Sequence, residues 1–234
     1  MMKKTLLFHG CMNRFYTSQV SEATEKILQK AKIDYSSLDN EECCGFILYE
    51  NGQEEAAINL MKKNLEKFSS LEDIDTILTS CPTCAYIFKN HYPDYLPDFN
   101  YNIMHVTELF AKLIEENKID IHTKKDIKVT FHDPCHLVRS LKITEEPRTI
   151  LEAVFEQDII EMKHSRDASK CCGAGSGVRL SFSRIANTLA KDRISEARNT
   201  GASVLVTSCP TCMLHLQDNS KNIDVVDIAE IFDL

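Results

Sequence analysis

Ten cysteines fall into two groups of five that share one pattern, C…C-C-G…C-P-T-C. The first group is Cys11, Cys43, Cys44, Cys81 and Cys84, and the second is Cys135, Cys171, Cys172, Cys209 and Cys212. The last four members of the second group each lie 128 positions after their counterparts in the first, and the hexapeptide T-S-C-P-T-C recurs letter for letter. The chain is therefore an internal duplication, and each copy keeps all five cysteines.

The spacing of these thiols is typical of metal or cluster ligands. In Cys-Pro-Thr-Cys, Pro82 and Pro210 suit the first turn of a helix, where a missing N–H is tolerated. Cysteines three positions apart then share a helix face, and the partial positive charge of the helix N-terminus favours thiolate. In Cys-Cys-Gly, neighbouring side chains of an extended strand would point apart, so the backbone must turn, and glycine permits that turn.

Five thiolates in each copy are one more than tetrahedral zinc or an ordinary four-iron cubane requires. Either one cysteine in each copy is a bystander or the centre is unusual, and the repetition favours an unusual centre. A thioredoxin-like dithiol at Cys-Pro-Thr-Cys would leave Cys-Cys-Gly unexplained. A single structural zinc site built from the two Cys-Pro-Thr-Cys sequences would leave six cysteines idle.

The segments between the cysteines predict alternating strands and helices. Apolar runs at 5–9 and 128–132 predict strands that deliver Cys11 and Cys135, and runs at 75–79 and 202–207 predict buried strands. Helical patterns follow each Cys-Cys-Gly, at 54–68 and 182–199. This alternation predicts an α/β protein of two tandem, repeated Rossmann-like domains with pseudo-two-fold symmetry. A polar stretch at 115–126 places the boundary between a domain over 1–120 and one over 121–234.

Composition limits the classes of function. A net charge of −8 over 234 residues argues against sequence-independent nucleic-acid binding, which needs a basic surface. The apolar run at the N-terminus is short for a signal peptide, and no stretch has the length of a membrane span. We therefore expect a soluble cytoplasmic protein without membrane insertion, in a reducing compartment that disfavours disulfides.

The duplicated pattern resembles the CCG-domain (cysteine-rich domain) family, which includes the B subunit of heterodisulfide reductase. The resemblance covers almost the whole chain and all ten cysteines. It implies two noncubane [4Fe-4S] clusters near the interface between the halves, each ligated by its five cysteines. It further implies an oxidoreductase acting on sulfur groups, in which the clusters reduce a small-molecule disulfide such as CoM-S-S-CoB.

The same resemblance leaves alternatives open. Some members of the family act only in electron transfer, within lactate or glycolate dehydrogenase or succinate/fumarate reductase complexes, and others hold zinc in one repeat. The chain has no ferredoxin-like cysteine run and no convincing flavin fingerprint. We therefore expect electrons to come from a cubane iron–sulfur subunit, similar to the C subunit of heterodisulfide reductase, and an upstream flavoprotein.

Some polar residues beside the cysteines are further candidates. His132 and His136 flank Cys135 and are possible proton donors to a departing thiolate, although such histidines are more often simply packed. Arg14, Arg139 and Arg179 follow cluster cysteines within a few residues and are candidates for steering an anionic substrate or partner, although a lone arginine is usually a surface residue.

Overall fold

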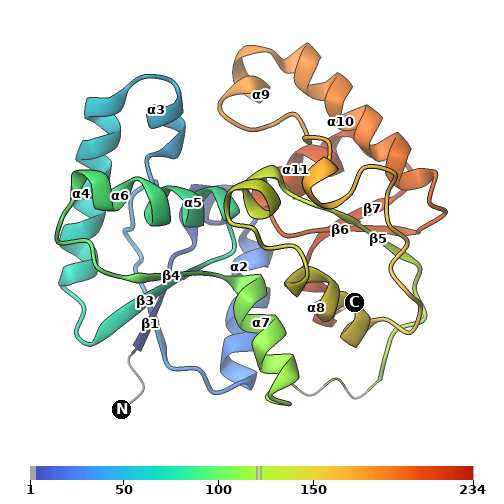
Figure 1. Cartoon of the computed structure of the whole chain (residues 1–234), viewed down its shortest axis with the longest axis horizontal. Coiled ribbons are helices and arrows are strands. Elements are labelled where there is room, and N and C mark those ends of the chain that lie inside the picture. The colour runs from blue at the N-terminus through green and yellow to red at the C-terminus, as the bar shows by residue number, and fades with distance from the viewer. Residues whose placement is uncertain (1–3, 120, 122, 234) are drawn as a thin grey trace.

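Two α/β halves lie side by side in the computed structural model, which describes residues 4–119, 121 and 123–233 (Figure 1). The first half contains a parallel sheet in the order β2-β1-β3-β4, and the second a parallel sheet in the order β5-β6-β7. The strands are β1 Lys4–Leu7, β2 Tyr35–Ser37, β3 Ile74–Thr79, β4 Asn102–His105, β5 Val129–His132, β6 Val204–Thr207 and β7 Asp224–Asp227. The predicted α/β class with two halves is confirmed.

Helices connect the strands in both halves. Those of the first half are α1 Gly10–Phe15, α2 Ser18–Lys30, α3 Phe46–Glu50, α4 Glu54–Ser69, α5 Pro82–Asn90, α6 Tyr92–Tyr95 and α7 Val106–Glu115. Those of the second half are the π-helical turn η1 His136–Ser140, α8 Glu146–Val154, η2 Arg166–Ala168, α9 Val178–Ser181, α10 Ser183–Arg198, α11 Pro210–Asn219 and η3 Glu230–Asp233. The helices predicted after each Cys-Cys-Gly are α4 and α10, so that prediction is confirmed.

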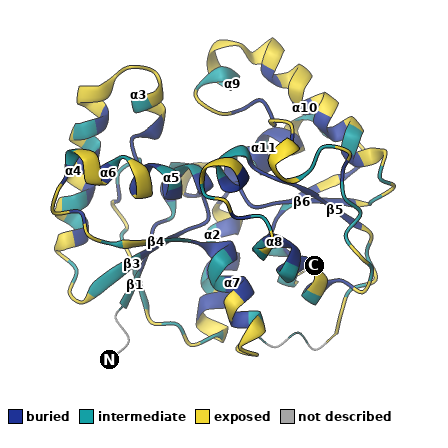
Figure 2. Ribbon diagram, viewed as in Figure 1, coloured by how far each residue is buried: buried dark blue, intermediate teal, exposed yellow. Residues whose placement is uncertain are grey.

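The strands that precede Cys-Pro-Thr-Cys are internal to their sheets. β3 pairs with β1 and β4, and β6 pairs with β5 and β7. All four residues of β6 are buried, as are the last three of β3. Figure 2 shows β5 and β6 mostly buried and the outer faces of α4 and α10 exposed. A continuous apolar strand covered on both sides is typical of parallel sheets.

One apolar core crosses from the first half to the second. It includes Leu7 and Phe110 from the first half together with Phe131 and Ile150 from the second. α7 packs along α8, and this contact joins the halves below the sheets. The strands of the first sheet end at 105 and those of the second begin at 129. The domain boundary at 120/121 stays a prediction, since residues 120 and 122 lie outside the described residues.

No helix within the described ranges is both long enough and apolar enough to cross a membrane.

Candidate functional site

Four of the ten cysteines follow directly on the carboxyl ends of parallel strands. Cys11 and Cys81 come after β1 and β3, and Cys135 and Cys209 come after β5 and β6. The carboxyl ends of parallel strands lie at one edge of a sheet, where loops gather functional groups. The topology therefore brings cysteines that are far apart in the sequence to one edge in each half.

The two Cys-Pro-Thr-Cys sequences form the starts of α5 and α11. Pro82 and Pro210 occupy the first helical positions, and Cys81 and Cys209 are the N-cap residues with extended backbone. The thiol of Cys81 receives hydrogen bonds from Cys209 and Cys84 and also from backbone N–H groups of the helix start, and these contacts hold its pKa well below the usual range. The predicted helix starts are therefore confirmed. Among the four cysteines of these two sequences, a lowered pKa is found at Cys81 alone, because hydrogen bonding to neighbouring thiols and burial raise the pKa of Cys84, Cys209 and Cys212.

The glycine of each Cys-Cys-Gly adopts the left-handed conformation that the sequence predicted. Gly45 has φ +87° and Gly173 has φ +93°. A Cβ at Gly173 would lie 2.6 Å from the carbonyl oxygen of Ala186 in α10, and one at Gly45 would lie 3.3 Å from that of Ala57 in α4. Both the turn and the close approach to the following helix thus require glycine.

All ten sulfur atoms join in one continuous series of contacts. The Sγ atoms of Cys11 and Cys43 lie 3.8 Å apart, and those of Cys172 and Cys212 lie 3.2 Å apart. The series runs from Cys11 through Cys43, Cys44, Cys84, Cys81, Cys209, Cys212, Cys172 and Cys171 to Cys135. The order in the second half mirrors that in the first, and every cysteine is a free thiol. The structure thus brings together all ten predicted site residues.

The first thiol of each Cys-Cys-Gly is strongly acidified by its neighbours. Hydrogen bonds from Cys11 and Cys44 lower the pKa of Cys43 to about 3. Hydrogen bonds from Cys135 and Cys172 likewise lower the pKa of Cys171 to about 2. Neighbouring thiols donate hydrogen bonds to these two thiolates. Because thiolate is the form that ligates metal, a bound metal would displace the protons of those thiols.

The exposed and buried sulfurs are distributed in the same way in both halves. Cys171 is exposed, and Cys11, Cys43 and Cys135 are half-buried. The six sulfurs nearer the middle of the series are buried: Cys44, Cys81, Cys84, Cys172, Cys209 and Cys212. Solvent therefore reaches the two ends of the series, and its middle is enclosed between the halves.

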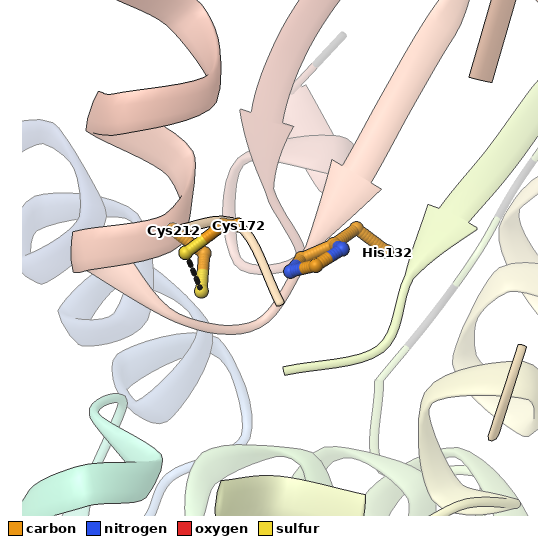
Figure 3. A group of neighbouring side chains, drawn as sticks. All are labelled: His132, Cys172 and Cys212. Carbon is orange, nitrogen blue, oxygen red and sulfur yellow. Dashed lines mark hydrogen bonds between the residues drawn. The ribbon is translucent and has the colours of Figure 1, made fainter. Parts of the chain in front are cut away.

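His132 lies beside the second group of cysteines. One ring nitrogen of His132 and the Sγ atoms of Cys172 and Cys212 all lie within 4.8 Å of one another, and Figure 3 shows the far end of the ring pointing toward the two sulfurs. Nδ1 accepts a hydrogen bond of 2.9 Å from Nε of Arg193, and Nε2 is buried without a partner among the described residues. Burial is the main cause that lowers the pKa of His132 to about 3, and the charge of Arg193 adds to it.

His136 lies between the halves. Its Nδ1 is 3.9 Å from Sγ of Cys135 and 3.4 Å from Oγ1 of Thr83, which belongs to the first Cys-Pro-Thr-Cys. Its ring packs edge-on against Phe46 and tilted against Tyr86, with centroid distances of 5.0 and 5.1 Å. His136 therefore links the first cysteine of one half to a helix start in the other.

Arg14 and Arg139 hold the segments that precede each Cys-Cys-Gly. Arg14 donates to the backbone carbonyls of residues 39 and 41, and Arg139 donates to those of residues 167 and 169. These acceptors are equivalent in the duplication, since each pair differs by 128 positions. Their guanidinium groups thus serve a structural role that the sequence did not predict. The sequence feature that could have indicated this role is that an arginine follows the first cysteine of both groups, at Arg14 and at Arg139.

The loops that carry Cys11 and Cys135 are held by buried acidic groups that the sequence did not single out. The carboxylate of Glu41 accepts from the backbone N–H groups of His9 and Gly10 at 3.2 and 2.5 Å, and burial raises the pKa of Glu41 to about 7. In the second half Asp133 forms a two-pronged ion pair with Arg148 at 2.9 and 3.0 Å. In both halves, a buried carboxyl group therefore fixes the loop that leads to the first cysteine of the group, Cys11 or Cys135.

Comparison with known proteins gives relatives that include subunits of oxidoreductases. The chain is 32% identical over 94% of its length to the D subunit of dihydromethanophenazine:CoB–CoM heterodisulfide reductase from Methanosarcina acetivorans, covering 56% of that protein. It is 30% identical over 97% of its length to the B subunit of fumarate reductase (CoM/CoB) from Methanothermobacter marburgensis, covering 45% of that protein. The chain thus spans about half the length of these curated relatives, which are subunits of oxidoreductases.

Among solved structures, an aspartate racemase of Picrophilus torridus is similar to this chain with a TM-score of 0.47 and 18% sequence identity. The similarity covers 97% of this chain and 90% of the racemase chain. The family model described as cysteine-rich domain (CCG) matches residues 5–89 and again residues 129–217. Each match contains one complete group of five cysteines. The chain therefore belongs to the cysteine-rich domain family, with two copies of the domain.

Proposed function

We propose that each group of five cysteines ligates one noncubane [4Fe-4S] cluster. The observation that carries this proposal is the mirrored series of contacts, in which no cysteine of either group stands apart. Five sulfurs on each side exceed the four that a tetrahedral zinc ion accepts. Nε2 of His132 is buried beside the second group and has no partner among the described residues. A bound cluster, which carries sulfides in addition to the cysteine thiolates, would give this nitrogen a partner.

We further propose that the chain is an iron–sulfur subunit of heterodisulfide-reductase type that reduces a small-molecule disulfide. When bound, the clusters would supply one-electron redox chemistry. His136 is the better placed of the two histidines to donate a proton to a departing thiolate, since it lies between the halves and beside Cys135. Cys135 is a half-buried residue, so the surface on that side is the proposed route of access for a substrate.

A non-catalytic electron-transfer role is the second candidate. The 30% identity to the B subunit of a fumarate reductase (CoM/CoB) favours it, since that relative is one subunit of a larger oxidoreductase. Zinc in one repeat remains part of this alternative, and the Sγ atoms of Cys172 and Cys212, which lie 3.2 Å apart, make the second repeat the place to test for it.

The proposed partners are a cubane iron–sulfur subunit and an upstream flavoprotein. The chain spans about half the length of relatives that are themselves subunits, which supports an assembly in which other segments deliver the electrons. A cytoplasmic location stays a prediction from the sequence.

Anaerobic metal analysis followed by electron paramagnetic resonance (EPR) tests the proposal. We expect about eight irons for each chain, four for each cluster. Anomalous diffraction at the iron and zinc edges then assigns the metal in each half, and zinc in either half contradicts the two-cluster proposal. A thiol or disulfide that alters the cluster signal supports the enzymatic role, whereas a signal that no thiol or disulfide alters supports electron transfer.

A further inference from the structure

The surroundings of His132 differ from those of its counterpart in the first half. His132 lies three residues before Cys135, and the residue three positions before Cys11 is Phe8. Phe8 is buried in an aromatic cluster, with ring centroids 4.8 Å from Phe88 and 6.0 Å from Phe68. The duplication therefore places a polar ring beside one group of cysteines and an apolar ring at the matching position of the other.

Arg193 determines which nitrogen of His132 carries the proton. Its guanidinium is a donor only, so the 2.9 Å hydrogen bond to Nδ1 requires that Nδ1 accept. The proton of the neutral ring must then reside on Nε2, at the end that faces Cys172 and Cys212 (Figure 3). An imidazolium ring is excluded by the same contact, because its Nδ1–H would meet the N–H of Arg193.

Arg193 is itself held rigidly. Its side chain has no exposed surface, and it donates to the carbonyl oxygen of His164 at 2.9 Å and to Oγ of Ser169 at 3.3 Å. It also pairs with Glu196 at 3.3 Å. The structurally equivalent residue of α4 is Asn64, since both are buried and Ala57 and Ala186 match in the same way. The amide of Asn64 donates to the carbonyl oxygen of Cys43 and to the hydroxyl of Tyr92, so among the described residues only the second half pairs this helix position with a histidine.

We infer that His132 is an N–H···S hydrogen-bond donor to the centre bound by the second group of cysteines, and that it raises the reduction potential of that centre above that of the first. The inference rests on the proposed pair of clusters. Hydrogen bonds to cluster sulfurs raise the potential because they stabilise the more negative, reduced state. The apolar ring of Phe8 provides no such bond in the first half, so electrons collect in the second.

His132 is not a metal ligand in this arrangement. A histidine that binds metal through one nitrogen donates its other N–H to a carboxylate or carbonyl oxygen. Here the other nitrogen faces a guanidinium donor, so Nε2 keeps its proton and cannot offer a lone pair to a metal.

His132→Phe tests the inference, since it gives the second half the residue type of the first. We expect unchanged iron content, a more negative midpoint potential for the second cluster, and no shift of the first in an EPR-monitored redox titration. His132→Gln, whose amide retains N–H donors, should recover part of the shift. The control His91→Phe changes a histidine of the first half outside the cysteine groups and should move neither potential.

Pulsed EPR on chains labelled with ¹⁵N-histidine provides a second readout. His136 also lies beside the second group, with Nδ1 3.9 Å from Sγ of Cys135. A weak ¹⁵N coupling that His136→Phe retains and His132→Phe loses supports a hydrogen bond from His132 to the second cluster. A strong coupling typical of direct ligation, or loss of iron in His132→Gln, overturns the inference. If His132→Phe keeps its full iron content and both potentials stay unchanged, the inference about His132 is wrong but the proposed pair of clusters stands. If the unmodified chain binds no iron, the proposed function is wrong as well.

Discussion

Cys81 and Cys209 contact each other across the interface between the two halves. Each is the N-cap residue of a helix, α5 or α11, and each is followed by proline at the first helical position. Their contact is the centre of the mirrored series of sulfurs, and it is the point at which the two groups of five become one set. A change at either residue should therefore be felt in both halves.

Two serine variants of the second group test this coupling. Cys209→Ser and Cys135→Ser should each lower iron to about four for each chain, because each removes a ligand of the second cluster. The EPR signal that remains belongs to the first cluster. It should differ between the variants, since only Cys209→Ser also removes the contact with Cys81.

Cys135 lies at the far end of the series and serves as the matched control, because its loss abolishes the same cluster without touching Cys81. Identical first-cluster signals in the two variants would show that the contact between the halves has no electronic effect.

The glycine of the second Cys-Cys-Gly gives a prediction about stability and cluster binding. In Gly173→Ala the new Cβ would meet the carbonyl oxygen of Ala186 at 2.6 Å, at a backbone φ of +93°. We expect a loss of roughly 1–3 kcal/mol from strain, and lower iron content because Cys171 and Cys172 are displaced. Anaerobic urea unfolding and iron analysis measure the two effects.

Gly201→Ala is the matched control. Gly201 also has a positive φ, of +78°, but no atom lies within 4 Å of its Cβ position. Only the conformational cost of about 1 kcal/mol is expected there, with full iron content. Equal losses of stability in both variants would mean that the close approach to α10 contributes nothing.

Much of this site could be predicted because its signals are local or repeated. The five-cysteine pattern, the proline after Cys81 and the glycine after Cys44 each specify a short stretch of backbone. The internal strands β3 and β6 each carry a short buried apolar run and end two residues before a cysteine. In contrast, β2, β4 and β7 contain at most two consecutive aliphatic residues, which are too few to indicate a strand in the sequence.

The contacts that hold the cysteines could not be predicted, because they depend on packing between distant segments. Arg193 lies in α10 among charged residues and looks like part of a solvated face, yet its side chain is fully buried against His132. Asp133 likewise gives no local sign of its ion pair with Arg148. The contact of Cys81 with Cys209 depends on how the two halves meet, which the shared core fixes and the spacing of the cysteines does not.

The ion pair of Asp133 and Arg148 should contribute strongly to stability. Both side chains are buried, with exposed fractions of 0% and 4%, and Glu161 binds the same guanidinium at 2.6 Å. Arg148→Met leaves the carboxylate of Asp133 buried without its charged partner, so the free energy of unfolding should fall by about 3–5 kcal/mol. Urea unfolding under anaerobic conditions measures the loss.

An exposed ion pair of similar length is the control. Lys26 and Asp233 lie 2.9 Å apart with exposed fractions of 59% and 45%, so Lys26→Met should change stability by less than about 1 kcal/mol. If both variants unfold at the same urea concentration, the buried pair does not hold the loop of Cys135 as the structure indicates.

His105 should make stability depend on pH. It is the buried N-cap residue of α7, where its Nδ1 accepts from the backbone N–H of Thr107, and burial lowers its pKa to about 4 from an ordinary 6.5. Between these values the unfolded chain binds a proton that the folded chain does not. The stability present above pH 6.5 is therefore lost progressively as pH falls toward 4, by roughly 3 kcal/mol from this group.

His105→Asn isolates this effect, because asparagine also caps helices but does not titrate. Other histidines with lowered pKa values, such as His9 and His215, remain in both proteins. The difference in free energy of unfolding between the original chain and the variant should therefore be largest above pH 7 and shrink toward pH 4.5. A difference that stays constant across this range would mean that His105 is protonated in the folded chain as readily as in the unfolded one.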